Sequence, residues 1–157
     1  SAAKFAVKGF SEALITDLAN NAPHVKVSVV MPGHIGTSIA INSGRILGGR
    51  QAEELSDEDV AGMRKRWASM GMANEETTDE QIRNLVGEMG RRFRDDAPTT
   101  AEQAASIILD GVREERWRIL IGKDAHRLDE LVREDPESAY TPEFMVRLRE
   151  TGEWGLG

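Results

Sequence analysis

The sequence predicts an α/β fold, because two apolar, β-branched segments are separated by a long stretch with helical signals. Residues 25–31 and 117–121 are almost continuously apolar, as strands buried in parallel sheets are. The long connection between them carries helical periodicity, which makes it a crossover. Strands joined by a helical crossover are parallel when they pair. We therefore expect two parallel strands with about five or six helices packed around them.

An amphipathic helix is expected before the first strand, over residues 1–19. Its apolar residues recur every three or four positions, which places them on one helix face. They are Ala3, Val7, Phe10, Leu14 and Leu18. Pro23 lies just beyond the predicted end of this helix, and Pro32 and Gly33 stop the strand that follows.

Residues 32–55 are rich in Gly and Ser, so a loop with one short helix is expected there. Later helices begin at hydroxyl residues that have a capping partner or an acidic first turn after them. These starts are Ser56, Thr78 with Gln81, and Thr100 with Gln103. Asp124 is expected to cap a short helix, and Thr141 with Pro142 starts the last one.

Composition and charge exclude several classes of function. The chain of 157 residues has the length of one domain, and it contains no cysteine, which rules out disulfides and thiolate metal sites. Its net charge of −7 argues against a nucleic-acid partner. No apolar run approaches the roughly 18 residues that a membrane span requires. We therefore expect a cytoplasmic protein with no membrane, nucleic-acid or metal partner.

The first residues, Ser1 to Lys4, resemble the end of the Tyr-x-x-x-Lys signature of short-chain dehydrogenases/reductases. Residues four apart share a helix face, so a lysine there favours the phenolate form of the tyrosine. In that family the lysine also holds the nicotinamide ribose. The tyrosine would immediately precede Ser1, so we expect the chain to begin just after it.

A second segment, Pro32-Gly33-His34-Ile35-Gly36-Thr37, resembles the family's Pro-Gly-x-(Ile/Val)-x-Thr segment after the sixth strand. The resemblance implies that Pro32, Gly33, Ile35 and Thr37 line the nicotinamide. Residues 118–125 resemble the family's last strand and turn, and residues 98–108 resemble the helix before it. Ligands of open α/β sheets bind outside the carboxyl ends of the strands, which suits this location.

The resemblance implies the C-terminal part of a Rossmann-like doubly wound parallel sheet. Residues 1–126 would form that half-domain, residues 41–96 a helical substrate-loop insertion within it, and residues 127–157 a helical tail. The parent would be an NAD- or NADP-dependent oxidoreductase acting on an alcohol or ketone, with Lys4 as its catalytic lysine.

Several parts of that family's machinery are absent from the sequence. The glycine-rich phosphate loop, the strand with the catalytic serine and the catalytic tyrosine are all missing. We therefore expect no turnover and no bound cofactor from this chain alone. The N-terminal half would be a separate piece or one removed by cleavage.

Three further residues are weaker candidates for a substrate pocket. His34 lies inside the Pro-Gly segment, while Met63 and Trp67 lie where a substrate lid would be, although simple helix packing explains them equally well. The three histidines have no metal-ligand spacing. As an alternative function, the chain is a non-catalytic α/β module that forms a homo-oligomer through an exposed strand edge and the helix of residues 1–19.

Overall fold

The computed structural model describes residues 2–46, 52–69, 71–74 and 76–153. They form a mixed α/β protein that is mostly helical, with short parallel strands. The chain packs as two compact units: a first unit of residues 1–35 and 98–157, and a second unit of residues 36–97. Seven α-helices are present in the described residues, compared with the five or six that the sequence predicted.

The first unit is built on two parallel strands, β1 (Val29–Pro32) and β4 (Arg118–Ile121). Val29 lies opposite Arg118 and Pro32 opposite Ile121, so the predicted parallel pairing is confirmed. The ladder begins where the Val29 N–H donates to the Trp117 carbonyl at 2.7 Å. Strand β1 is therefore shorter than predicted. Strand β4 begins at Arg118, opposite Val29, so residues 25–28 have no β4 residue to pair with.

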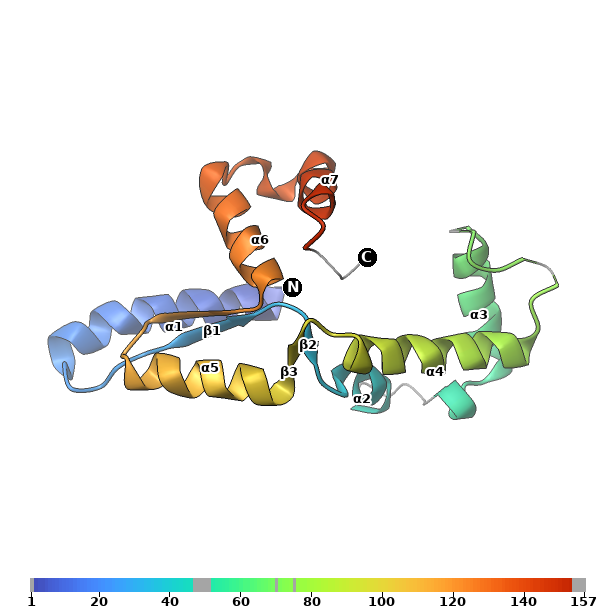
Figure 1. Cartoon of the computed structure of the whole chain (residues 1–157), viewed down its shortest axis with the longest axis horizontal. Helices are drawn as coiled ribbons and strands as arrows, with labels where there is room; N and C mark the ends of the chain where they lie inside the picture. Colours follow the sequence, from blue (N-terminus) through green and yellow to red (C-terminus); the bar gives the residue numbers. More distant parts are fainter. Residues whose placement is uncertain (1, 47–51, 70, 75, 154–157) are drawn as a thin grey trace. The chain divides into compact units, whose positions relative to one another are not determined.

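Helices α1 (Ala2–Asn21) and α5 (Ala101–Arg113) cover opposite faces of this strand pair (Figure 1). On the α5 side, Ala104 packs with Ile119 and Ile121 in a buried cluster. The approach is close, since a Cβ on Gly111 of α5 would lie 2.5 Å from Ile119 Cδ1. Because strand side chains alternate, Leu120 points to the other face, where α1 lies.

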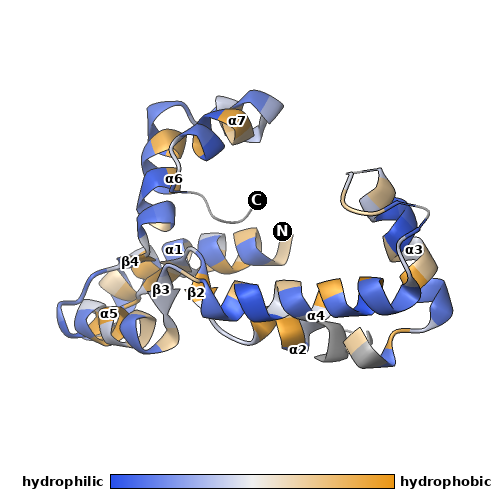
Figure 2. Cartoon of the chain, turned by 45° about the vertical axis from the view of Figure 1, so that its right-hand side comes forward, coloured by the Kyte–Doolittle hydropathy of each residue, from blue (hydrophilic) through white to orange (hydrophobic). Residues whose placement is uncertain are grey.

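Helix α1 covers its face of the strands only loosely. None of the α1 residues is buried, and Phe10 is 69% exposed. The predicted apolar periodicity is thus present in a helix whose apolar side chains find few partners in this unit. Orange patches on α1 in Figure 2 mark these hydrophobic positions.

After β4 the chain forms α6 (Lys123–Glu134), the short 3-10 helix η2 (Ser138–Tyr140) and α7 (Pro142–Glu150). A buried cluster of Leu131, Phe144 and Leu148 joins α6 to α7. The Thr141 side chain caps α7, with Pro142 at its first turn, as the sequence predicted.

The second unit contains α2 (Ile39–Ile46), the 3-10 helix η1 (Ala52–Glu54), α3 (Asp57–Ala68) and α4 (Asp79–Asp95). Its core consists of Leu55, Val60 and Ile82. The predicted helix starts at Ser56 and Thr78 are both confirmed as capping boxes.

Two very short strands, β2 (Ile35–Gly36) and β3 (Thr99–Thr100), form a second sheet that the sequence did not predict. Thr100 is also the residue that caps α5, and its predicted capping box with Gln103 is confirmed. In the part of the chain that is described, no helix has both the length and the apolar character to cross a membrane.

Candidate functional site

The candidate site is the turn of residues 32–35, which follows the carboxyl end of β1. Two successive backbone amides hold this turn to the end of β4. The Gly33 N–H donates to the Ile121 carbonyl at 2.9 Å, and the His34 N–H donates to Asp124 Oδ2 at 2.6 Å. His34 is consequently a buried residue, 7% exposed, rather than a solvated loop histidine.

Asp124 is the residue beside this turn that sequence reasoning placed wrongly. The helix-capping position of α6 belongs to Gly122, which makes no side-chain cap, and Asp124 lies in the first helical turn. Its carboxylate is only 1% exposed and also accepts the Ala125 N–H at 2.9 Å. A negative charge in the first turn of a helix is further stabilised by the helix dipole.

Two glycines leave the space that this carboxylate fills. A Cβ on Gly33 would lie 2.0 Å from Asp124 Oδ1, and a Cβ on Gly122 would lie 2.4 Å from the same atom. Gly122 also has a φ of +93°, which disfavours any side chain. The signal in the sequence was therefore a glycine at the end of each predicted strand, with an aspartate two residues after the second.

A groove of about 650 Å³ lies on the α1 face of the strands, and Pro32 and Gly33 form part of its wall. Most of the lining is apolar, including Phe5 of α1, Leu120 of β4 and Phe144 of α7. Lys4, the predicted catalytic lysine, is exposed. Its neighbour Phe5 brings the start of α1 to the same groove as the end of β1.

The charges in this groove are paired. Lys8 Nζ lies 2.7 Å from Glu12 Oε1, and Asp129 accepts hydrogen bonds from Arg118 and, at 2.9 Å, from Arg133. Burial by itself raises the pKa of Asp129, but the hydrogen bonds from Arg133 and Arg118 outweigh burial. The pKa of Asp129 therefore lies below its ordinary value of 3.8.

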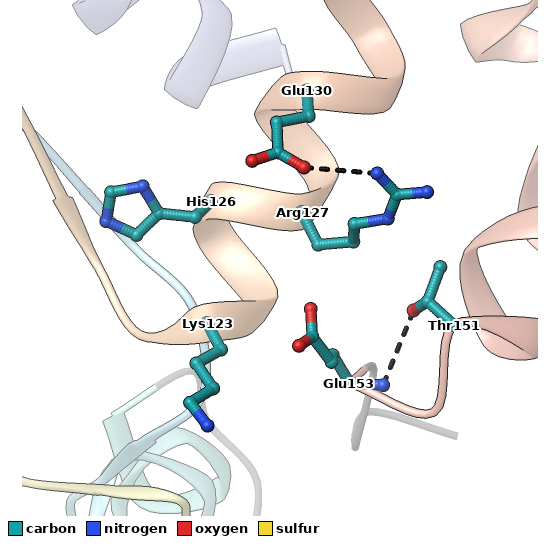
Figure 3. A pocket seen from close by; sticks show the side chains of 6 residues that line it. All are labelled: Lys123, His126, Arg127, Glu130, Thr151 and Glu153. Atoms are coloured by element: carbon teal, nitrogen blue, oxygen red, sulfur yellow. Dashed lines mark hydrogen bonds and ion pairs between the residues drawn. The ribbon is translucent and has the colours of Figure 1, made fainter.

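A second hollow of about 530 Å³ lies beside the start of α6 (Figure 3). The side chains drawn there diverge, and His126 points away from Arg127. Arg127 pairs with Glu130 at 3.1 Å, while the Glu153 N–H donates to the Thr151 hydroxyl at 3.4 Å. These groups satisfy one another and do not converge on a common point, so the hollow offers no evident chemistry.

The remaining predicted site residues have other surroundings. Ile35 packs against the buried cluster of β4 and α5. Thr37 is half-buried and belongs to the second unit. Met63 and Trp67 pack against the core of the second unit.

Comparisons with protein-family models, with curated proteins and with solved structures found no match to the chain. Among the residues that the structure places, no three His, Cys, Asp or Glu side chains gather as metal ligands would.

The residues at this turn fit one end of a nicotinamide cofactor. Pro32 and Gly33 border a mainly apolar groove that can accept the face of a flat ring. The pyrophosphate end has no matching feature, because the sequence contains no glycine-rich phosphate loop. The fit thus extends only to a flat ring at Pro32 and Gly33, and Lys4 is not among the residues that line the groove.

Proposed function

We propose that the first unit is the C-terminal half of a Rossmann-like domain from an NAD(P)-dependent oxidoreductase of the short-chain dehydrogenase/reductase type. The observation that carries the proposal is the turn of residues 32–35. It leaves the carboxyl end of a parallel strand, where open α/β sheets bind ligands, and it borders a groove that α1 also lines.

The arrangement of the sheet supports a larger parent domain. As far as the chain is described, the outer edge of β1 pairs with no strand. Parallel sheets are normally covered on both faces and continue on both sides of a central strand. The open edge is thus where the remaining strands of a doubly wound sheet would add.

In the proposed parent, the bound nicotinamide supplies or accepts the hydride that converts an alcohol and a ketone into one another. Pro32 and Gly33, which border the groove, would form one wall for the ring. Lys4 would hold the ribose hydroxyls and favour the phenolate of a tyrosine four residues earlier. Tyr140, the single tyrosine of the sequence, lies in η2 and lines the same groove as Pro32 and Gly33.

Binding of cofactor halves tests this proposal. Reduced nicotinamide mononucleotide and NADH should bind the full chain about equally and weakly, with a Kd of about 1 mM or more, because only the nicotinamide end is recognised. Adenosine monophosphate should not bind, which makes it the matched control. Equal binding of adenosine monophosphate, or no binding of the nicotinamide half, would contradict the proposal.

Turnover gives a second test of the same proposal. The chain lacks the tyrosine, the serine and the phosphate loop, so it should not oxidise NADH or NADPH with any ketone. Absorbance at the nicotinamide band with a panel of small ketones measures this. Robust oxidation by the chain alone would show that its chemistry resides in other residues.

The exposed face of α1 favours an alternative hypothesis, a non-catalytic module that self-associates. Val7 and Phe10, which lie on the predicted apolar face of α1, are 62% and 69% exposed, and exposed apolar patches of this kind mark association surfaces. A second copy of the chain would cover them together with the open edge of β1. Sedimentation equilibrium decides: a stable monomer at micromolar concentration would refute self-association.

A further inference from the structure

Asp124 is the only buried carboxylate in the described part of the chain, and no step of the proposed function uses it. Its hydrogen-bond partner His34 is 90 residues away in sequence. A buried charge is costly unless hydrogen bonds compensate it. Two backbone N–H groups, those of His34 and Ala125, provide this compensation.

The two amides of the turn are held in different ways. The Gly33 N–H meets a backbone carbonyl, that of Ile121, and continues the pattern of the parallel ladder. The His34 N–H lies beyond the last rung and meets a side chain. The Asp124 carboxylate therefore fixes the His34 amide, while the next residue, Ile35, begins strand β2, which pairs with β3.

The space around the carboxylate explains why an aspartate serves here. Its oxygens lie within 2.5 Å of the positions that a Cβ on Gly33 or Gly122 would take. A longer acid would not fit between the two glycines. An asparagine would present an amide to one of two N–H groups, leaving that donor without an acceptor.

We infer that Asp124 is a positioning residue that holds residues 33–35 in the shape needed to form a nicotinamide wall. This inference rests on the proposed function for its ligand, but the hydrogen bond can be tested without any ligand. Asp124 does not contact the ring in this scheme. It acts through the backbone of His34, whose N–H it accepts.

The unchanged full chain gives the first test, by nuclear magnetic resonance. A through-hydrogen-bond scalar coupling should connect the His34 amide nitrogen with the Asp124 carboxyl carbon. Absence of that coupling in a resolved spectrum would overturn the inference, whatever the function is.

The variant Asp124→Asn provides the second test, with Glu130→Gln on the exposed side of α6 as the matched control. Hydrogen exchange at the His34 amide should become about fivefold to tenfold faster in Asp124→Asn, because a neutral acceptor replaces a charged one. Exchange at Ile119 and Ile121 should stay unchanged, which shows that the sheet is intact. Unchanged exchange at His34 would refute the inference.

Titration with reduced nicotinamide mononucleotide links the hydrogen bond to binding. Asp124→Asn should bind this probe about threefold to tenfold more weakly than the unchanged chain, and Glu130→Gln should bind it equally well. Equal affinity of Asp124→Asn despite a freed His34 amide would overturn the positioning role. If the unchanged chain does not bind the probe, the proposed function fails instead, and the coupling alone decides whether Asp124 holds the turn.

Discussion

The substitution Gly33→Ala tests the packing of the turn against Asp124 most severely. The added Cβ would lie 2.0 to 2.3 Å from three side-chain atoms of Asp124, well inside contact distance. The carboxylate must therefore leave its position and lose the hydrogen bonds from His34 and Ala125. Hydrogen bonds to charged groups contribute about 1.5–3 kcal/mol each. We expect the free energy of unfolding to fall by about 3–5 kcal/mol.

Urea denaturation followed by circular dichroism measures this loss, with Gly9→Ala as the matched control in the same unit. A Cβ on Gly9 has nothing within 4 Å, and Gly9 lies inside α1. Alanine is a better helix former than glycine by about 1 kcal/mol. Gly9→Ala should thus leave stability unchanged or raise it slightly.

A double-mutant cycle identifies the cause of the loss. Asp124→Gly removes every side-chain atom of Asp124, so Gly33→Ala should cost about 1 kcal/mol or less in that background. The two substitutions should therefore couple by about 2–4 kcal/mol. Additive costs, or an equally large effect of Gly33→Ala without the carboxylate, would refute this account of the turn.

Two further predictions concern the frame around the site. Gly111→Ala should destabilise the first unit by about 1–3 kcal/mol, because the new Cβ would lie 2.5 Å from Ile119 Cδ1, and trimming Ile119→Val should not restore the wild-type stability fully. The pKa of Asp129 in the folded protein lies below its ordinary value. Its contribution to the free energy of unfolding is therefore fully present above pH ~4 and is lost as the pH falls further. When urea denaturation midpoints are measured over a series of acid pH values, Asp129→Asn should lose less stability below pH ~4 than the unchanged chain. An unchanged pH profile would contradict the ion pairs of Asp129 with Arg118 and Arg133.

Local signals made much of the fold predictable. The capping boxes at Ser56, Thr78 and Thr100 depend on residues three positions apart, and each starts a helix as expected. The parallel pairing of the two strands also followed from their order and their helical connection. The capping boxes require no knowledge of distant parts of the chain, and the strand pairing requires only the order of the predicted elements.

The parts that escaped prediction depend on residues far apart in sequence. Strand β1 starts at Val29 because its partner β4 begins at Arg118, and apolar composition from residue 25 onward could not show that. Asp124 looked like a helix cap because its neighbours on the chain suggest one. Its real partner, the His34 amide, becomes visible only when the ends of β1 and β4 lie side by side.

The helix of residues 1–19 shows a different limit. Its apolar spacing correctly predicted a helix, α1, but the same spacing cannot say what covers the apolar face. Val7 and Phe10 remain largely exposed in this chain. Either further strands of the proposed larger domain or a second copy would cover them, and sedimentation tests the second of these hypotheses.

The central claim is that residues 32–35 form a nicotinamide wall, and one titration tests it most directly. Reduced nicotinamide mononucleotide is added to the isotope-labelled full chain, and the amide resonances are followed. The account predicts shifts concentrated at Gly33, His34 and Ile35, with none along the exposed face of α4. Shifts spread evenly over the chain, or confined to residues away from the end of β1, would contradict it.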